Sequence, residues 1–378
     1  MGQQTRLKQL DVLRAIAVLL VLGSHKQTLT LWMRSGWIGV DLFFVLSGFL
    51  VSGLLFTEYQ KHGKVRLKRF LIRRGFKIYP PFYTLWFTTI LLVTVVAGSR
   101  IPSSVLISES LFVQNYGPAF WGHTWSLAVE EHFYLLLAAG IFFLLKNAGF
   151  NPFVYIPRVT LFIGLLLLAL RVLTAIYVVP FSLKTHQYPT HLRLDSLLFG
   201  VLLSYYHHFH HETFSASIRR YWKLITTASC LMIASCLLID QSSFFMSTIG
   251  YTLLYLGFGG ILLVSFYSCF TVPQFLRRPW SLVGAALAFV GVHSYSIYLW
   301  HLPVANWGFM AFHHFFRPLD YKLEFLLYLL ASLGVGVLMA KLVERPSLWI
   351  RERFYPSRIN PVASGPGPSD MVTAPEVS

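Results

Sequence analysis

Apolar runs long enough to cross a lipid bilayer recur along almost the whole chain. A membrane-spanning helix needs about 20 consecutive, mostly apolar residues, because an α-helix rises about 1.5 Å per residue and the hydrocarbon core is about 30 Å thick. Charged residues make up only 12% of the chain and the mean hydropathy is +0.60, whereas soluble domains typically carry about 25% charged residues. The sequence therefore predicts an all-α integral membrane protein whose helices form one bundle around a central cavity.

The apolar runs predict ten spans. The first should remain in the protein as a helix, because no small-residue cleavage site of a signal peptide follows it. The predicted spans cover about residues 10–30, 36–57, 78–98, 125–145, 157–178, 194–209, 222–239, 246–269, 283–305 and 323–343.

The basic residues are distributed unevenly between the two sides that these spans define. With the N-terminus in the cytoplasm, 22 of the 31 Lys and Arg residues fall on the cytoplasmic side and 7 on the outer side. Such an excess is typical of cytoplasmic loops. It predicts that both termini are cytoplasmic, and it explains the net charge of +16 as topology. We therefore expect membrane lipids as partners, and no nucleic acid.

The chain divides into one membrane domain and a short tail. Residues 1–355 contain all the predicted spans, without an internal repeat. Residues 356–378 are rich in Pro, Gly, Ser and Val and have few large apolar side chains, so this tail is predicted to be a disordered cytoplasmic segment. The three cysteines lie in apolar runs and predict small buried side chains rather than disulfides.

Arg14 and His25 are the first candidates for function, since an ionisable group inside a span costs several kcal/mol unless it is paired or faces a cavity. They are eleven residues apart, which places them on nearly the same helix face, about 16–17 Å apart along the axis. A guanidinium at the inner mouth of a tunnel and an imidazole deeper in it suit a long donor with a phosphorylated head, such as coenzyme A. The alternative is an arginine that reaches the lipid headgroups and a structural histidine.

Two further groups suggest donor binding and proton transfer. Arg73, Arg74 and Lys77 form a basic cluster that suits phosphate groups, although a loop that binds anionic lipid is the alternative. Glu130 and Glu131 follow Trp125 and Ser126 near a helix start. They point about 100° apart, so one of them is expected to face the cavity as an acid–base partner of a histidine, unless both only stabilise the helix terminus.

The remaining polar residues are assigned mainly to structure. Arg193 and Asp195 are predicted to form a local ion pair, in preference to a role in the cavity. His301 lies near the outer end of the ninth span and is a cavity candidate. The histidines at the other helix ends lack acidic partners at metal-ligand spacing, so no metal site is predicted; they are His207, His208, His210, His211, His313 and His314.

Together these segments resemble the membrane acyltransferase 3 family, which O-acetylates surface polysaccharides and related glycans. The resemblance covers nearly all of residues 10–346. It is carried by Arg14 with His25, the run Gly39-Val-Asp-Leu-Phe-Phe-Val-Leu-Ser-Gly-Phe, Arg73-Arg74 followed by Pro80, Trp125-Ser126 with Glu130-Glu131, Tyr298-Leu-Trp-His301 and Glu344-Arg-Pro346. Lys77 stands where the family usually has arginine, and His132 where glutamine is common.

The resemblance implies a multi-pass protein of the bacterial inner membrane with no metal or redox cofactor. It implies an acyl-CoA donor, acetyl-CoA by family habit, that enters from the cytoplasm, and a carbohydrate or glycolipid acceptor on the outer side. Some relatives carry an esterase-like domain after the membrane domain; none follows residue 355 here, so we expect no acceptor specificity from such a domain.

The site residues follow from the residue patterns and the resemblance together. His25 is the predicted general base, or alternatively a transient acyl carrier, and Glu130 is predicted to orient an imidazole or the acceptor. The predicted catalytic residues are His25, Glu130, Glu131 and His301; the donor-binding residues are Arg14, Arg73, Arg74 and Lys77; the cavity residues are Asp41, Ser47, Trp125, Ser126, Arg193 and Asp195. The alternatives are a transporter or flippase for an anionic or glycan substrate, and a lipid-binding scaffold.

Overall fold

The computed structural model describes residues 8–25, 30–146, 152–267, 277–317 and 319–357, and these residues form helices and turns without a strand. The predicted tail from 358 onward and Cys269 lie outside the described residues. The longer helices are α1 (Lys8–Gly23), α3 (Gly39–His62), α4 (Leu67–Leu91), α6 (Trp125–Lys146), α7 (Ile156–Tyr177), α9 (Leu194–Phe209), α10 (His211–Leu238), α11 (Tyr251–Phe266), α12 (Arg277–Val292), α13 (Ser294–Pro303), α15 (Tyr321–Met339) and α16 (Arg345–Phe354). Shorter elements are α2 (Thr30–Ser35), α5 (Ser103–Ser110), α8 (Leu183–His186), α14 (Phe309–Phe315) and single turns at Gly36–Ile38, Leu92–Val96, Gly122–Thr124, Thr190–Leu192, Met246–Gly250, Val304–Gly308 and Ala340–Glu344.

Seven of the described helices are long and apolar enough to cross a membrane. They are Leu31–His62, Leu67–Val96, Gly122–Lys146, Ile156–Tyr177, His211–Leu238, Met246–Phe266 and Tyr321–Phe354. An eighth span results if Ser281–Val292 and Ser294–Phe315, which meet at an angle of 68°, count together. The all-helical class is thus confirmed, while the number of ten spans and the orientation of the termini stay predictions. The other two predicted spans correspond to α1 and α9, which have only 16 residues each.

The break between α12 and α13 falls at His293, within what was predicted as one span over residues 283–305. Backbone groups that a break releases in a membrane need other partners. The His293 ring connects the end of α12 to α16, since its Nδ1 lies 2.8 Å from the Phe289 carbonyl oxygen and its Nε2 lies 3.1 Å from Arg345 Nη2. The break is therefore tied to the start of α16.

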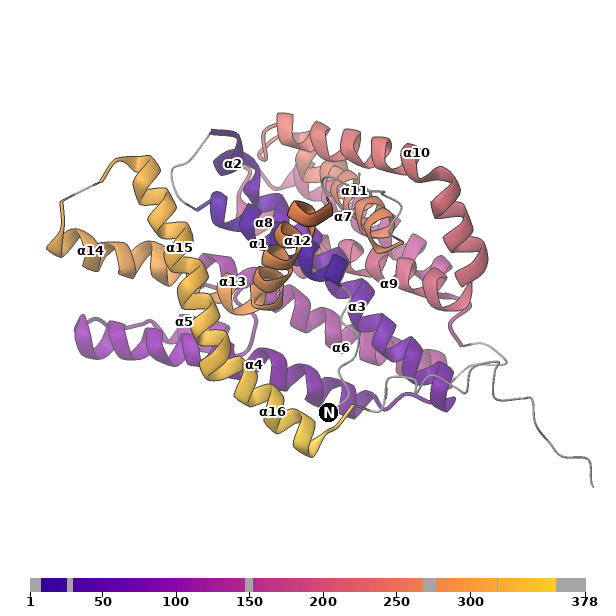
Figure 1. The fold of residues 1–378 in the computed structure, drawn as a ribbon, viewed down its shortest axis with the longest axis horizontal. Coiled ribbons are helices and arrows are strands. Elements are labelled where there is room, and N and C mark those ends of the chain that lie inside the picture. Colours follow the sequence, from indigo (N-terminus) through magenta and orange to yellow (C-terminus); the bar gives the residue numbers. More distant parts are fainter. Residues whose placement is uncertain (1–7, 26–29, 147–151, 268–276, 318, 358–378) are drawn as a thin grey trace, which may run out of the picture.

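Helix α3 is the centre of the molecule (Figure 1). Its Val40, Phe44 and Leu55 belong to an apolar cluster shared with α4, α6 and α13, whereas its Leu42 and Leu46 belong to a second cluster shared with α1, α9 and α11. A helix that is apolar on all sides is expected to be buried. Helix α3 therefore separates two packing layers.

Two glycines allow α3 and α9 to touch. A Cβ atom on Gly48 would lie 1.9 Å from the Leu197 carbonyl oxygen, and one on Gly200 would lie 2.3 Å from the Val45 carbonyl oxygen. Small residues at such crossings let helix backbones approach closely in membranes. Any larger side chain at either position would push the two helices apart.

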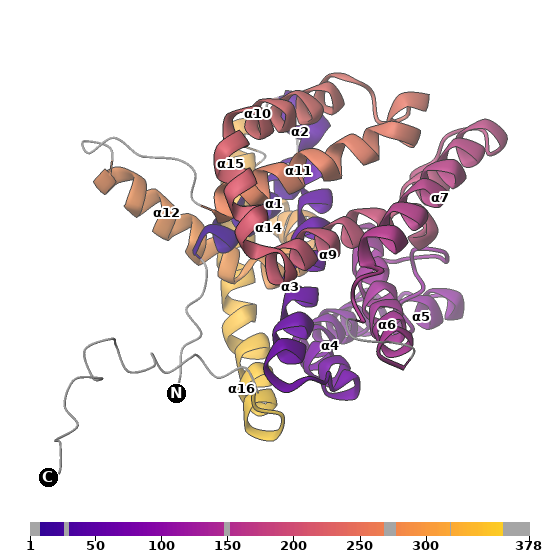
Figure 2. The ribbon, with the colours of Figure 1, turned by 90° about the vertical axis from the view of Figure 1, so that its right-hand side faces the viewer.

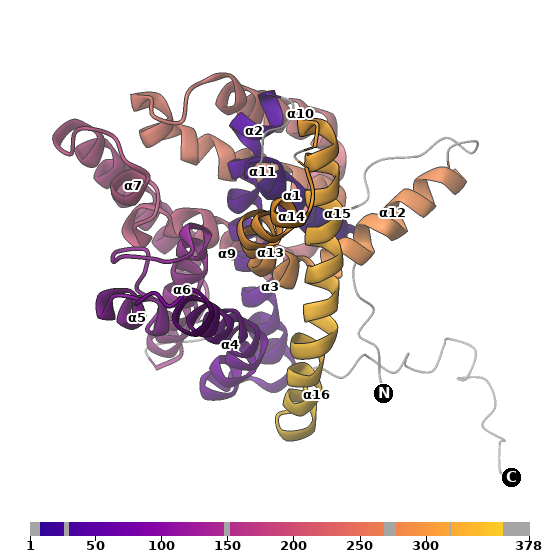
Figure 3. The same cartoon turned by 90° about the vertical axis from the view of Figure 1, so that its left-hand side faces the viewer.

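Helices α7 and α12 project from the centre on opposite sides, as Figures 2 and 3 show. Large apolar side chains of α7 and α10 are exposed, among them Phe162 (69%), Leu224 (68%) and Leu231 (66%). Such surfaces suit contact with lipid. On the opposite side of the bundle, α15 and α16 form one long stretch that passes the ends of α4 and α13 (Figure 3).

Candidate active site

A cavity lies between α1, α3, α4, α6 and the α12–α13 break. Its enclosed volume is about 110 Å³, which is below the range of about 300–1,000 Å³ for sites that hold drug-sized molecules. Its polar lining combines cations, a carboxylate and hydroxyl groups: Arg14, Ser47, Arg74, Lys77, Ser126, Glu130, Tyr134, Tyr295 and Tyr298. Six of the fourteen site residues predicted from the sequence therefore line this cavity, and the other eight lie elsewhere.

Three of the four predicted donor-binding cations line the cavity. Among the described residues Arg74 has no hydrogen bond or ion pair; its guanidinium carbon lies 5.8 Å from the centre of the Tyr134 ring. Lys77 is paired with Glu344, and Arg14 lies 3.4 Å from Asp11 Oδ1. Arg74 is thus the cation of this group whose hydrogen-bonding capacity is least used.

Arg73 points away from the cavity. Its Nη2 atom forms an ion pair with Glu352 of α16 at 2.8 Å, and its Nη1 donates to the same carboxylate at 3.2 Å and to the Tyr355 carbonyl oxygen. Consecutive helix residues point about 100° apart, so Arg73 and Arg74 cannot face one cavity equally. The structure therefore divides the predicted basic cluster.

The two adjacent glutamates also take different positions. Glu130 lines the cavity and accepts hydrogen bonds from Ser47 Oγ at 2.8 Å and Tyr134 Oη at 2.9 Å. Glu131 is buried and accepts from Tyr79 Oη at 2.9 Å. No imidazole bonds to either carboxylate among the described residues, so the structure does not bring Glu130 to the histidine that it was predicted to orient.

Three histidine rings form a separate group beside the cavity. His25, two residues beyond α1, lies with its ring centre 4.8 Å from that of His301, which lies 4.9 Å from that of His123. Both pairs meet edge to face. His123 and His301 are buried, whereas His25 is exposed.

Backbone carbonyl groups fix the tautomers of these three rings, because a carbonyl oxygen only accepts a hydrogen bond. Nδ1 of His25 lies 2.9 Å from the Val21 oxygen, Nδ1 of His301 2.5 Å from the Tyr298 oxygen, and Nε2 of His123 3.2 Å from the Leu299 oxygen. Each of these nitrogens therefore carries the proton. The opposite nitrogens of neutral rings keep their lone pairs, and those of His123 and His301 are buried without a partner among the described residues.

Tyr298 and Ser126 connect the cavity to the histidine group. The Tyr298 hydroxyl lies 2.6 Å from Ser126 Oγ and donates to the His123 carbonyl oxygen at 2.7 Å. Its ring contacts His123 and His301 at 5.4 and 5.6 Å between centres. His25 is not part of the cavity lining, so the single open tunnel predicted between Arg14 and His25 is replaced, in the described part, by a cavity and a histidine group that share this wall.

Asp41, Arg193 and Asp195 do not line the cation-lined cavity; they are buried in crossed ion pairs. Arg193 Nη2 lies 2.6 Å from Asp41 Oδ1, and Arg171 Nη1 lies 2.6 Å from Asp195 Oδ2. The predicted local pair between Arg193 and Asp195 was therefore wrong. Arg193 stands at the turn before α9 and reaches back to α3, whereas Asp195 reaches α7.

Sequence reasoning missed Glu109 and gave His123 no role. The Glu109 carboxylate is buried and accepts hydrogen bonds from the Phe120 and Trp121 amides, at 3.1 and 3.3 Å, and from Thr124 Oγ1 at 3.2 Å. It thus holds the turn that carries His123. Burial raises the pKa of Glu109 to about 7. A lone acidic residue in the apolar run 105–113 was the available signal.

Comparison with known sequences decides which family this constellation belongs to. Residues 7–341 match the sequence model of the acyltransferase 3 family, which describes an acyltransferase domain. The chain belongs to the acyltransferase 3 family. The resemblance drawn from the sequence motifs is therefore confirmed.

Two relatives of this family member are O-acetyltransferases by name. The chain is 29% identical over 316 residues to a protein from Listeria monocytogenes called peptidoglycan O-acetyltransferase OatA, with 78% of this chain and 49% of the relative covered. It is 30% identical over 315 residues to O-acetyltransferase OatA of Staphylococcus aureus strain NCTC 8325, with 78% and 50% covered. The chain spans about half the length of the curated relatives it matches. No solved structure shows a significant match.

The family landmarks separate into two places in this member. Arg14, Arg74, Ser126 and Glu130 line the cavity, while His25 and His301 lie in the histidine group. Trp125 stacks on Tyr188 at 4.9 Å and lines a different hollow. Among the described residues, no set of three or more His, Cys, Asp or Glu side chains is arranged to hold a metal ion.

Proposed function

We propose that this chain is a membrane O-acyltransferase that moves an acyl group, acetyl in the first instance, from cytoplasmic acyl-CoA to a hydroxyl group of a glycan or glycoconjugate on the outer side of the bacterial plasma membrane. The observation that carries the proposal is a cation-lined cavity beside three imidazoles whose lone-pair nitrogens are defined by their backbone contacts. The names of the relatives support O-acetyl transfer and a glycan acceptor.

The donor would bind in the cavity through its phosphate groups. Arg74 offers a planar fork of donors without a partner among the described residues, and Arg14 and Lys77 add positive charge. The thioester end of the arm would then lie toward Ser126 and Tyr298. The proposal requires that these two side chains open a path to the histidine group.

His25 would act as the general base. Its Nδ1 proton is donated to the Val21 oxygen, so Nε2 is free to take the proton of the acceptor hydroxyl. The hydroxyl oxygen attacks the thioester carbonyl, the new C–O bond forms, and the C–S bond breaks. The proton taken by His25 passes to the departing thiolate, which leaves as free coenzyme A.

The test is transfer of labelled acetyl from acetyl-CoA by purified protein in the presence of envelope glycan. His25→Ala should lower the initial rate by about 10²- to 10⁴-fold, the usual contribution of a positioned acid–base group, and should leave insertion into the membrane unchanged. His314→Ala, an exposed histidine outside both regions, is the matched control. Full transfer by the His25 variant would remove the proposed role of this histidine.

The broken span at His293 favours a transporter or flippase as the second candidate. Interrupted helices commonly form the substrate sites of transporters, and α12 and α13 meet at 68° on the cavity wall. A transporter would move a glycan or anion across vesicle membranes without consuming a thioester. Release of coenzyme A thiol that depends on glycan separates the two functions.

A further inference from the structure

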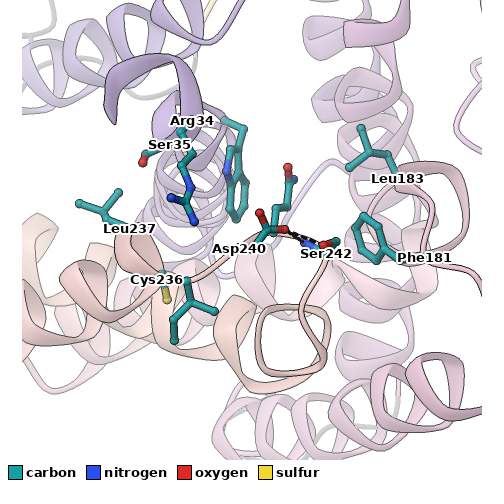
Figure 4. Close-up of a pocket in the computed structure, with 11 residues that line it drawn as sticks. Arg34, Ser35, Phe181, Leu183, Cys236, Leu237, Asp240 and Ser242 are labelled. Atoms are coloured by element: carbon teal, nitrogen blue, oxygen red, sulfur yellow. Dashed lines mark hydrogen bonds between the residues drawn. The ribbon is translucent and has the colours of Figure 1, made fainter. Parts of the chain in front are cut away.

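A second hollow lies at the end of the bundle where α2 follows His25 (Figure 4). It has a volume of about 330 Å³ and lies between α2, the segment before α8 and the loop after α10. Its polar and aromatic lining includes Arg34, Trp37, Phe181, Asp240, Gln241 and Ser242. The cation-lined cavity of the proposed donor site shares no residue with it.

The two charged residues of this hollow are not paired with each other. Figure 4 shows Arg34 and Asp240 entering it from different elements. Both are exposed, and neither forms an ion pair in the described part of the chain. Asp240 Oδ1 accepts hydrogen bonds from Ser242 Oγ and N at 2.6 and 2.8 Å. These bonds, and to a smaller extent the positive charge of Arg34, lower the pKa of this carboxyl group. The hollow therefore presents the Arg34 guanidinium, which only donates hydrogen bonds, and the Asp240 carboxylate, which accepts them.

This combination selects for an uncharged, polyhydroxylated ligand. A hydroxyl group both donates and accepts, so one ring can bond to Arg34 and to Asp240. An anion would be repelled by Asp240 and a cation by Arg34. Trp37 and Phe181 add the apolar surface on which the carbon faces of a sugar ring pack.

The hollow is attached through α2 to the end of α1, the helix that precedes His25. Trp32 of α2 donates from Nε1 to the Leu19 carbonyl oxygen at 3.1 Å, and its ring fills the space beside Gly23, where a Cβ would lie 1.8 Å from Nε1. Helix α2 therefore sits on the end of α1, two residues before His25. A ligand held by Arg34 is bound beside the chain segment that carries the proposed base.

A third hollow continues toward the histidine group. Leu183 lines both hollows. The third one has a volume of about 400 Å³ and is also lined by Lys184, Gln114 and Trp125. Gln114 is buried, and its Oε1 has no hydrogen-bond partner among the described residues. Gln241 Nε2 donates to Gln187 Oε1 at 2.6 Å and so joins the loops around the two hollows. Trp125 lies two residues after His123.

We infer that these two hollows form one site for an oligosaccharide acceptor, with one sugar ring between Arg34 and Asp240 and the ring to be acylated on the Trp125 side. This inference rests on the proposed function and adds to it the class of acceptor: an extended glycan of at least two rings whose distal ring is uncharged, rather than a single sugar. The distal ring makes no contact with the reacting atoms, so its contribution is to binding.

The experiment compares Arg34→Gln and Asp240→Asn in envelope fractions that contain the whole protein and the cell's own glycan. Incorporation of labelled acetyl into glycan is measured in these fractions. Release of free coenzyme A thiol by hydrolysis of acetyl-CoA is measured on the purified whole protein without glycan. Each variant should lower incorporation at limiting glycan by about three- to tenfold, because each loses a charged hydrogen bond to the ligand. Thiol release should stay within about twofold. Arg100→Gln, exposed and outside all three cavities, is the matched control.

The other outcomes overturn the inference in recognisable ways. Unchanged incorporation in both variants means that the hollow does not bind the acceptor, while the proposed function stands. A loss with Arg34→Gln and a gain with Asp240→Asn means that the ligand is an anion, such as a lipid headgroup. Parallel loss of incorporation and thiol release means that Arg34 and Asp240 support the fold rather than bind the acceptor, which also overturns the inference. No incorporation by the unaltered protein removes the proposed function itself.

Discussion

Two regions of this molecule place arginine and carboxylate side chains inside apolar helices, and they use them in opposite ways. In the cation-lined cavity, Arg74 and Glu130 face open space, and Glu130 is held by two hydroxyl groups. In the ion-pair cluster of Asp41, Arg171, Arg193 and Asp195, all four side chains are at most 2% exposed. The same residue types thus form an accessible site in one place and a closed structural core in the other.

The difference lies in what each charge contacts. The ion-pair cluster has opposite charges at 2.6 Å, and Arg193 also covers the Tyr251 ring at 4.0 Å. Arg74 has neither a hydrogen bond nor an ion pair among the described residues. A buried charge therefore indicates a candidate binding site only where its partner is absent and space adjoins it.

The largest expected effect belongs to the ion-pair cluster. Arg193→Ala should destabilise the protein by about 3–5 kcal/mol, because it leaves the Asp41 carboxylate buried without its partner. The combined replacement Asp41→Leu with Arg193→Met should recover most of the stability and keep acyl transfer. Thermal unfolding in detergent measures the first effect, with Arg100→Ala as control. A stable double variant without transfer would show that the cluster belongs to the active site.

Glu109 tests a third arrangement, a buried carboxylate balanced by neutral donors. Its pKa is raised by burial to about 7, so between the usual pKa near 4.5 and about 7 the folded state binds more protons than the unfolded state. This contribution to stability is complete below pH 4.5 and decreases as the pH rises to about 7, by the order of 3 kcal/mol. The unfolding temperature should therefore fall from pH 5 to pH 8 more in the unaltered protein than in Glu109→Gln. Parallel pH profiles would contradict this role.

Arg74 tests the cavity. Arg74→Gln should raise the KM for acetyl-CoA by about 10- to 100-fold, since a charged hydrogen bond to phosphate contributes about 1.5–3 kcal/mol. The unfolding temperature should change little, because Arg74 has no ion pair to lose among the described residues. Arg74→Lys keeps the positive charge but loses the planar set of donors. Its KM for acetyl-CoA should therefore lie between those of the unaltered protein and Arg74→Gln. An unchanged KM would place the donor elsewhere.

The smallest expected effect concerns the contact between α4 and α16. Glu352→Gln should release Arg73 from a partly exposed ion pair, which contributes about 0.2–1 kcal/mol. If Arg73 then reaches the donor, the KM for acetyl-CoA falls by up to about fivefold. If Arg73 only anchors α16, the KM stays constant and the unfolding temperature drops slightly.

The sequence predicted the helical class, the family and most of the polar residues near the cavity, because long apolar runs and buried charges are visible without coordinates. It did not predict which partner each charge would choose. Arg193 and Asp195 are neighbours in sequence, yet each pairs with another helix, since the turn before α9 sends their side chains in different directions. The break at His293 was also missed, because hydropathy does not register a bend within an apolar run.

His123 shows the same limit within the site. Its place in the histidine group depends on the contact between the turn before α6 and helix α13, which joins residues 175 positions apart in the case of Tyr298. Spacing along one helix could relate Arg14 to His25, but it could not place a residue from another helix. Long-range packing, which residue patterns do not encode locally, decides these positions.

The touching backbones of α3 and α9 at Gly48 and Gly200 have a consequence for how this protein can change. Ser47, which bonds to Glu130 in the cavity, is the neighbour of Gly48, so sliding α3 along α9 would misplace that hydroxyl group. The contact therefore fixes the position of Ser47 relative to the rest of the cavity wall. Substrate preference can diverge through the loops that surround the outer hollows, while this crossing tolerates almost no substitution.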